Sequence, residues 1–494
     1  MADTAADYYE KLLEAPIVIR PHPYVDAPFM QWENEAELIP TVTYPEILNI
    51  LRSRKKKQSL DIHGLSPFIL DKIPKNYWHL LVQLYNYSFS EGYILNKFKE
   101  VRMILLAKKN AICIPDQTRP ISLLDSFLKV QEKLFHCRFL KILKDRGILP
   151  DNQSGFRAGF RLQTRVLLLI DQISSYMSNS SPTTTVFVDF KSAFDQLWFE
   201  GCLGKLARIG IPTAYVNWIR AWLNDRKAVI EVKGKRSRWI KIHRGCPQGS
   251  SFSPTLFITY HSDMADYLPG AMSFFFADDL AAVLAGQIGI RFTNQCIDLE
   301  YRLQNFLDQL ELYSILSVQP VNYSKTQAMF SARAVSYPNP LPQVHCGDHS
   351  LEWITAFKYL GYWLSTKIGR PRITTQEDDN LIIDAAFDVE EPTSKKVRDH
   401  VPSQNLNVSE RTTCRRLKDA GFRYCTPLSK PLLTLQHQQH RLQWTKQVRN
   451  QDWNNVIATD ETTFRLTTVH RMHWQVPGNR TVRRTLKFPL KINV

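Results

Sequence analysis

The segment Phe276-Ala277-Asp278-Asp279 places two adjacent carboxylates inside an apolar stretch that runs from Ala271 to Ala285. Burying one unpaired carboxylate is costly, and burying a second beside it adds mutual repulsion. Divalent cations would remove that cost, so the pair predicts a metal site. β-prone residues before the pair and apolar residues after it predict a hairpin with the pair at its tip. Asp378-Asp379 serves as an internal control, because its polar surroundings predict a solvated helix start.

Charge is distributed unevenly along the 494 residues, whose formal net charge is +16. Residues 395–494 contain 19 Lys and Arg against 6 Asp and Glu, a net charge of +13, which leaves +3 for the first 394 residues. So basic a tail predicts a polyanionic partner, nucleic acid first and an anionic membrane surface second. No long basic amphipathic helix and no apolar run of ~18 residues supports a membrane.

Cysteine usage and the first residues of the chain indicate the compartment. The eight cysteines are scattered singly, without a CxxC pair or zinc spacing, which is typical of reduced thiols inside the cell. The N-terminus lacks the basic start and apolar core of a signal peptide. We therefore expect a protein of the nucleus, the cytoplasm or both. The run Ser53-Arg54-Lys55-Lys56-Lys57 is either an import signal or a solvated or phosphate-contacting face.

Patterns of apolar residues predict an α+β chain. Strands are expected over 101–107 and 183–190, a helix over 126–143, and a hairpin that joins 228–232 to 237–242.

Two stretches are expected to lack regular structure. Residues 1–42 are mixed in composition and interrupted by proline, which predicts an irregular leader. Near residue 367 the composition changes to Arg, Gln, Thr and His, and Gly369-Arg370-Pro371-Arg372 has the composition of a linker. We therefore expect a boundary between domains at this point, with a linker over 367–373.

Two more segments give the aspartate pair a chemical context. In Val186–Asp195 a strand ends on the carboxylate of Asp189, and in Arg244–Pro254 a loop rich in Gly and Pro leads into a helix. A carboxylate at a strand end, beside a hairpin with two more, can bridge two divalent ions. Such ions sit ~3.5–4 Å apart and stabilise the attacking and leaving oxygens of phosphoryl transfer. Mg²⁺ suits this set because it prefers few carboxylates together with substrate phosphates.

Seven motifs, in order, make residues 43–366 resemble the reverse transcriptases of LINE-type (non-LTR) retrotransposons. Ala277-Asp278-Asp279 resembles the xADD box, Asp189 with Ala193-Phe194-Asp195 the D-x-x-x-A-F-D box, and Gly245–Gly249 the G-x-P-Q-G loop. The other four are Ile104–Lys108 with Arg119–Leu124, Gln153–Arg157, Asn322–Thr326 and Phe357–Gly361. The resemblance implies a right-handed polymerase fold, with fingers over 43–185 and a palm over 186–366.

The resemblance also implies roles for single residues. Asp189 and Asp278 would hold two Mg²⁺ ions (or Mn²⁺), with Asp279 as the supporting carboxylate. Phe194 would be the steric gate against a ribose 2′-hydroxyl, or else a plain core aromatic. Lys108 and Arg119 would bind the triphosphate, or else be solvated surface charges, and Gln248 would contact the template–nucleotide pair. Lys325 would lie at pyrophosphate or simply on the surface. Asp195 would be structural, capping or bonding backbone. The implied substrates are an RNA template, a DNA primer and deoxynucleoside triphosphates.

Beyond residue 368 the chain resembles part of a mariner-superfamily DNA transposase instead of the helical thumb expected of a LINE-type enzyme. Arg370 and Arg372 resemble a linker that reads a narrow minor groove. Residues 374–430 predict an all-α helix-turn-helix segment that binds duplex DNA. Three short helices are expected between 374 and 421, and Thr393-Ser394 would cap the second. The third would open at Ser409-Glu410 and present Arg411, Thr412, Arg415 and Arg416 to DNA. A helical bundle with a basic surface is the alternative.

Residues 431–494 resemble the truncated start of an RNase H-like transposase domain, in which Asp460 matches the first of three carboxylates. One carboxylate cannot assemble a two-metal site, so we expect no transposase activity. The chain would then join fragments of two mobile elements. Three functions follow for testing: RNA-directed DNA polymerisation, a DNA-binding protein with an inactive polymerase, or a degenerate element with neither activity. The intact aspartates count against the last.

Overall fold

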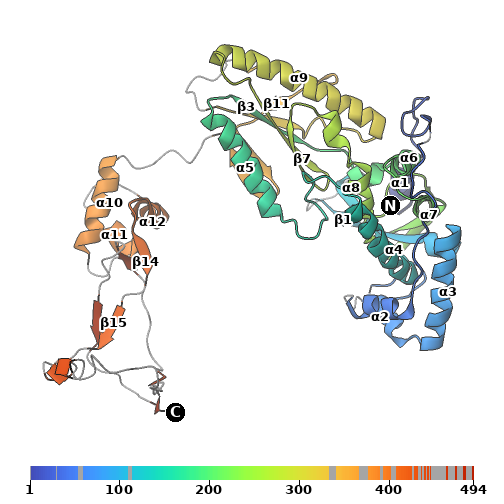
Figure 1. The fold of residues 1–494 in the computed structure, drawn as a ribbon, viewed down its shortest axis with the longest axis horizontal. Helices are drawn as coiled ribbons and strands as arrows, with labels where there is room; N and C mark the ends of the chain where they lie inside the picture. The colour runs from blue at the N-terminus through green and yellow to red at the C-terminus, as the bar shows by residue number, and fades with distance from the viewer. Residues whose placement is uncertain are drawn as a thin grey trace. The chain divides into compact units, whose positions relative to one another are not determined.

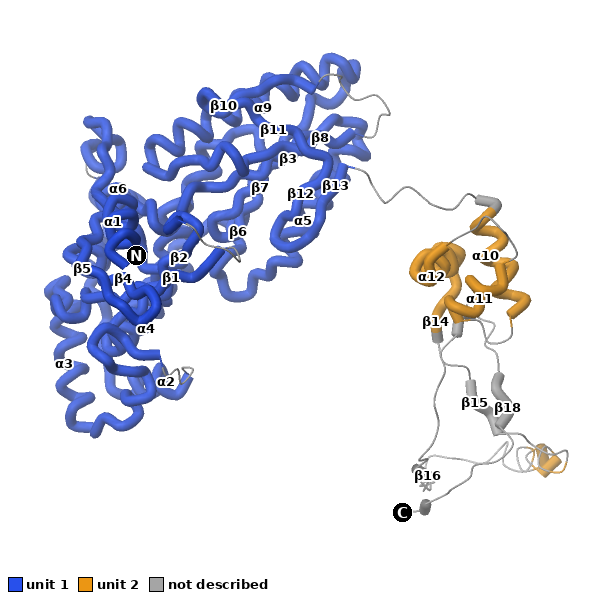
Figure 2. Tube along the Cα trace, turned by 180° about the vertical axis from the view of Figure 1, so that it is seen from behind, with its two compact units in different colours: residues 1–366 blue, residues 367–494 orange. Residues whose placement is uncertain are grey.

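The computed structural model describes residues 2–28, 30–53, 59–108, 114–332, 341–366, 376–389, 393–401 and 408–425, and beyond these only short pieces. The chain forms two compact units, residues 1–366 and residues 367–494 (Figure 2). Within the described residues, no helix is both long enough and apolar enough to span a bilayer.

The first unit is organised around a five-stranded sheet, in the order β11-β8-β3-β7-β6. Neighbouring strands are antiparallel except β11 and β8, which are parallel. The strands are β3 (Thr183–Val188), β6 (Met272–Phe276), β7 (Asp279–Ala285), β8 (Gln327–Ser331) and β11 (Glu352–Trp353). The predicted strand near 183 and the aspartate hairpin are confirmed.

Both faces of this sheet are covered, because apolar residues occupy both sides of its central strands. On β3, Phe187 packs in one hydrophobic cluster with α5 (Leu162–Ser178), whereas its neighbours Val186 and Val188 pack in the other with α9 (Phe292–Ser317). Successive strand residues point to opposite faces, so α5 and α9 lie on opposite sides of the sheet (Figure 1). The strands β12 (Ala356–Tyr359) and β13 (Tyr362–Ser365) pair with each other, and their Tyr359 and Leu364 pack in the cluster of α5.

A second sheet, in the order β2-β1-β4-β5, completes the frame of the first unit. Its strands, β1 (Glu100–Ala107), β2 (Thr118–Leu123), β4 (Arg226–Val232) and β5 (Lys235–Ile242), confirm the predicted strand and hairpin. The helix predicted over 126–143 is α4 (Ser126–Asp145), whose first amides at Phe127 and Leu128 donate to the Asp125 carboxylate. The other helices are α2 (Tyr44–Ser53), α3 (Lys75–Glu91), α6 (Phe199–Arg208), α7 (Thr213–Leu223) and α8 (Ser253–Tyr260).

The predicted irregular leader over 1–42 is wrong in its first part. Ala2–Leu12 forms helix α1, which buries Ala5, Ala6 and Tyr9 and lies against β4 and β5. The Tyr9 hydroxyl is within 2.8 Å of Thr118 Oγ1 on β2. The small residues Ala5 and Ala6 allow this helix to pack closely. The mixed composition and the prolines of residues 1–42 hide its helical pattern in the sequence.

The second unit contains the three short helices expected between 374 and 421: α10 (Gln376–Asp388), α11 (Ser394–His400) and α12 (Glu410–Asp419). Their apolar faces form a core of Ile382, Ala385, Ala386, Val397, Val408, Leu417 and Phe422. The side chains of Thr393 and Ser409 accept hydrogen bonds from Lys396 N and Thr412 N, which confirms both predicted helix starts. The segment is not purely helical, because Arg423–Cys425 forms strand β14, paired with β17 (His473–Gln475).

Candidate active site

Asp189 lies directly after β3, where the chain leaves the centre of the five-stranded sheet. The segment that begins at Asn322 holds it there. Asn322 N donates to the carbonyl of Asp189 at 2.8 Å, and Asn322 Nδ2 donates to the carboxylate Oδ2 at 2.7 Å. Lys325 Nζ is 3.3 Å from the same oxygen. One carboxylate oxygen is therefore oriented by two side chains of one turn.

The aspartate pair lies at the tip of the β6–β7 hairpin, where Phe276 pairs with Asp279. Ala277 has a φ of +62°, and this left-handed residue turns the chain. Asp278 and Asp279 are solvent-exposed, while the flanking Phe275 and Leu280 are buried. The expectation of buried carboxylates is therefore wrong, because a turn at a sheet edge directs its polar side chains outward even when both strands are apolar.

Electrostatics link the three carboxylates. Although Asp279 is exposed, the protein around it displaces part of its hydration. This loss, followed by repulsion from Asp278 and Asp189, raises the pKa of Asp279 to about 6. Loss of hydration also raises the pKa of Asp278; the negative charge of Asp189 adds to this rise and the positive charge of Arg119 opposes it. The negative charge of Asp189 therefore disfavours ionisation of both hairpin carboxylates.

The three carboxylates have the chemistry of a metal site but are not closely gathered. Across the described ranges, no three carboxylate, imidazole or thiol side chains are gathered tightly enough to form a metal-binding cluster. The chemistry of the donors nevertheless fits a hard divalent cation: they are carboxylate oxygens with excess negative charge, and within the described residues neither Asp278 nor Asp279 forms an ion pair.

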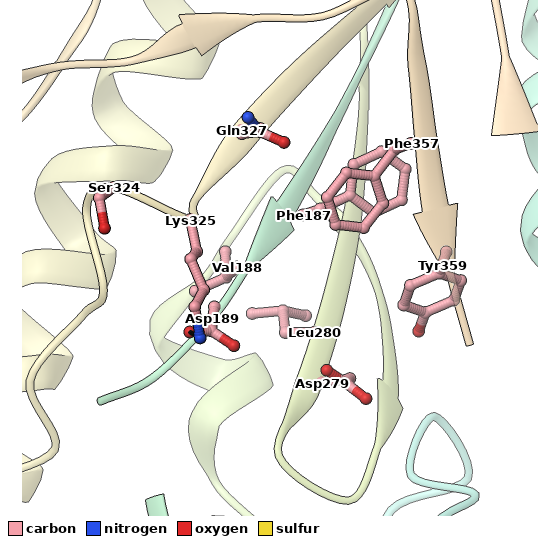
Figure 3. Close-up of a pocket in the computed structure, with 10 residues that line it drawn as sticks. All are labelled: Phe187, Val188, Asp189, Asp279, Leu280, Ser324, Lys325, Gln327, Phe357 and Tyr359. Atoms are coloured by element: carbon pink, nitrogen blue, oxygen red, sulfur yellow. Dashed lines mark ion pairs between the residues drawn. The ribbon is translucent and has the colours of Figure 1, made fainter. Parts of the chain in front are cut away.

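Asp189, Asp279 and Lys325 line one cavity of about 240 Å³, in which the Lys325 ammonium lies beside Asp189 (Figure 3). Its walls are largely apolar and come from β3, β7 and β12; they include Phe187, Leu280 and Tyr359. In Figure 3, Asp189 and Lys325 lie together on one side of Leu280, and Asp279 lies on the other side, toward Tyr359.

The Gly245–Gly249 loop lies against the segment that follows β3. A Cβ at Gly245 would be 2.7 Å from the carbonyl oxygen of Asp195, and one at Gly249 would be 2.6 Å from that of Ser122, so both glycines permit close backbone approach. Gln248 Nε2 donates to both carboxylate oxygens of Asp195 at 2.9 Å. Asp195 is buried as expected of a structural residue, but its carboxylate contacts a side chain and not backbone; burial raises its pKa to about 6.

The other residues predicted to serve the nucleotide lie around the same region. Phe194 is half-buried and stacks on Phe257, with ring centroids 4.7 Å apart. Lys108 Nζ donates to the carbonyl of Asp116 at 2.8 Å, and its charge opposes the rise in the pKa of Asp195. Arg119 is exposed on β2. The charge of Lys108 therefore acts on the buried Asp195, and that of Arg119 acts on Asp278.

Two residues with contacts to the site were given no role by sequence reasoning. Asn322 orients Asp189, and Gln153 hydrogen-bonds Ala277. Each belongs to a motif quoted above, so the motifs marked the correct segments. Their partners, however, lie more than 120 residues away in the sequence, and no local pattern reveals such a contact.

In the second unit, the structure separates the residues predicted to face DNA. Arg411 and Arg415 are exposed on α12, and Thr412 is half-buried at the helix start. Arg416 does not face outward: its side chain is 12% exposed and lies 3.6 Å from Asp379 on α10 and 2.9 Å from Asp419. Leu417 and Thr413 are buried, and Arg416 is on the edge of that buried face. Arg370, Arg372 and Asp460 lie outside the described residues.

Two family models match this chain, one in each unit. A family model described as reverse transcriptase (RNA-dependent DNA polymerase) matches residues 106–364, and one described as transposase matches residues 389–450. In *Drosophila melanogaster*, the probable RNA-directed DNA polymerase from transposon BS is 27% identical over 67% of this chain and 36% of its own length. The RNA-directed DNA polymerase from mobile element jockey is 25% identical over 70% of this chain and 37% of its own.

The chain thus spans little more than a third of the length of these relatives. A solved structure of apo telomerase from *Candida tropicalis*, truncated from its C-terminal domain, aligns with 59% of each chain at 12% identity and a TM-score of 0.37. The reverse transcriptase model covers more than half of the 494 residues, including Asp189, Asp278 and Asp279. The chain therefore belongs to the reverse transcriptase family.

Proposed function

We propose that the first unit catalyses RNA-directed DNA polymerisation, with deoxynucleoside triphosphates, an RNA template and a DNA primer as substrates. The observation that carries this proposal is that Asp189, which follows β3, and Asp279, from the neighbouring β6–β7 hairpin, line one cavity at one end of the sheet. Like charges without compensation are a poor arrangement for stability and a suitable one for binding cations.

Asp189 and Asp278 would hold two Mg²⁺ ions, or Mn²⁺ in their place, with Asp279 as the supporting carboxylate. When bound, such ions neutralise phosphate charge and lower the pKa of an attacking hydroxyl. The protein's part is to orient the ligands. Asn322 fixes one oxygen of Asp189, which leaves its second oxygen and the hairpin carboxylates directed toward solvent and substrate.

Nucleotide selection would depend on residues around the carboxylates. The ring of Phe194 stacks on Phe257, and as the steric gate it would exclude a ribose 2′-hydroxyl by contact. Arg119 and Lys108 would bind the triphosphate, Arg119 through its bidentate fork. Lys325 would meet pyrophosphate charge, and Gln248, held by Asp195, would contact the template–nucleotide pair.

Primer extension on an RNA template, with and without Mg²⁺, tests this function. The double variant Asp278→Ala/Asp279→Ala should lose extension, and the matched control Asp378→Ala/Asp379→Ala should keep it. Equal incorporation by wild type and the first variant would reject the metal assignment. A Phe194→Ala variant should incorporate ribonucleotides more readily than wild type, if Phe194 is the gate.

We further propose that the second unit binds duplex DNA through α12. Arg411, Arg415 and Lys418 are exposed at i, i+4 and i+7, so they share one helix face, in the segment that the transposase model matches. Arg411→Ala and Arg415→Ala should weaken binding, and each should reduce the slope of log affinity against log salt by about 1 if it contacts phosphate. Affinity that does not change in either variant would remove α12 from the interface.

A further inference from the structure

The turn that carries Asp278 contains a strained residue whose support comes from elsewhere in the chain. Ala277 adopts a φ of +62°, a region that residues with a Cβ rarely enter. Without external support, such a residue returns readily to a right-handed or extended conformation. The direction of the next side chain, Asp278, would change with it.

Residues 152–154 supply that support through an isolated parallel bridge between Gln153 and Phe275 of β6. Phe275 N donates to the carbonyl of Asn152 at 2.8 Å, and Ser154 N donates to the carbonyl of Phe275 at 3.0 Å. Between these two bonds lies Gln153, whose side chain is directed at the turn. It is 6% exposed, so its hydrogen bonds are shielded from water.

The side-chain amide of Gln153 hydrogen-bonds both polar backbone groups of Ala277. Its Oε1 accepts from Ala277 N at 3.0 Å, and its Nε2 donates to Ala277 O at 3.1 Å. The same Oε1 accepts from Gly155 N at 2.7 Å. These bonds are made to Ala277 in its left-handed conformation, so a change in its backbone angles would break at least one of them.

Gly155 brings the supporting segment close enough for these bonds. A Cβ at position 155 would be 2.0 Å from Ala277 N and 2.7 Å from Ala277 Cα, both backbone atoms that cannot move aside cheaply. Arg165, buried on α5, closes the other side of the segment. It donates from Nε to Ser154 Oγ and from Nη2 to the carbonyl of Asp151, each at 2.7 Å.

We propose that Gln153 is a positioning residue for polymerisation, which holds Ala277 in its left-handed conformation and thereby directs the carboxylate of Asp278. This inference rests on the proposed polymerase function. Gly155 permits the contact, and Arg165 holds the segment that makes it.

The test combines two substitutions. Gln153→Met keeps the side-chain volume and removes every side-chain hydrogen bond of residue 153. Ala277→Gly lowers the conformational cost of a positive φ at residue 277. Gln153→Met should lower kcat about 10- to 30-fold, as expected for the loss of one to two shielded hydrogen bonds. The KM for nucleotide should stay within about twofold, because the ground-state contacts of the substrate remain. Ala277→Gly in the Gln153→Met background should recover about 5- to 10-fold, since glycine enters the left-handed region freely.

A second readout does not depend on activity. In metal-free protein labelled at alanine methyl groups, the Ala277 resonance, assigned by its loss in Ala277→Gly, should move in Gln153→Met. Thermal unfolding should show that each variant is folded, and Gln153→Glu, which keeps the acceptor oxygen, replaces Gln153→Met if the latter is not. An unchanged kcat in an otherwise active protein, or a loss that Ala277→Gly does not relieve, would overturn the positioning role. An inactive wild type would instead reject the polymerase function.

Discussion

Each unit of the chain contains one Asp-Asp pair, and the two pairs lie in opposite environments. Asp278 and Asp279, flanked by apolar residues, are exposed at a hairpin tip. Asp379, from the polar segment around 374–380, is buried on α10 beside Arg416. Neighbouring residues therefore do not decide the burial of a carboxylate. What decides it is whether the local backbone directs the side chain to an edge or to a packed face.

A basic residue lies near each pair, and the exposure of these two basic residues differs in the same way. Lys325, which lies near Asp189 and the hairpin, is 67% exposed, whereas Arg416, beside Asp379, is 12% exposed. An exposed lysine is weakly held and screened by salt, and a shielded guanidinium is fixed by its partners. The first arrangement leaves charge available to a ligand, and the second uses charge to join helices.

The largest contrast should appear in catalysis. Under the proposed function, Asp278→Asn removes a charge that binds cations, so primer extension should fall by about 10³-fold or more, a loss of about 4 kcal/mol in transition-state stabilisation. Asp379→Asn should leave the extension rate within about twofold of wild type. Single-turnover extension of a labelled primer, with thermal unfolding of both variants as control, measures the difference. Comparable losses in the two variants would show that fold, not chemistry, is affected.

The sequence predicted the elements of the site better than their contacts. Strand and helix positions followed from periodicity, and the order of seven motifs pointed to Asp189, Asp278 and Asp279. The hydrogen bonds from Asn322 to Asp189 and from Gln153 to Ala277 could not be predicted, because each joins segments brought together by the sheet. Arg416 was placed on the wrong face of α12 because charge in the sequence does not distinguish a residue at the edge of the core from one that faces DNA.

The next largest effect should be on the stability of the second unit. Asp379→Ala leaves Arg416 with one carboxylate partner fewer in a shielded position, so α10–α12 should lose about 1–3 kcal/mol. Hydrogen–deuterium exchange of the full chain reads this loss as faster exchange of amides in α10 and α12, with the first unit unchanged. Asp384→Ala, at an exposed position of the same helix, is the matched control. Equal exchange in both variants would mean that the ion pair contributes nothing.

Removing the charge of Asp279 from the hairpin should raise the free energy of unfolding and not lower it. The pKa of Asp279 is raised from 3.8 to about 6, so its ionised form is disfavoured in the folded state. In metal-free buffer at pH 7 Asp279 is ionised in both states, and Asp279→Asn should be more stable than wild type by up to about 1 kcal/mol after allowance for solvent screening. As pH falls through 6 toward 3.8, Asp279 is protonated first in the folded state, so the free energy of unfolding of wild type should rise to that of Asp279→Asn. Urea unfolding at pH 7, 5 and 4 measures it, and a difference that grows on acidification would contradict the sign.

The smallest effect should come from Lys325, and it separates the two interpretations of this residue. Its ammonium lies 3.3 Å from Asp189 but is mostly exposed, so the ion pair itself should contribute little to stability. If Lys325 meets pyrophosphate charge, Lys325→Gln should lower kcat about threefold, close to 0.7 kcal/mol, and the loss should shrink at high salt. Lys358→Gln, exposed on the nearby β12, is the control for net charge. Identical kinetics in the two variants would make Lys325 a surface lysine, and the hairpin carboxylates would then depend on cations from solution alone.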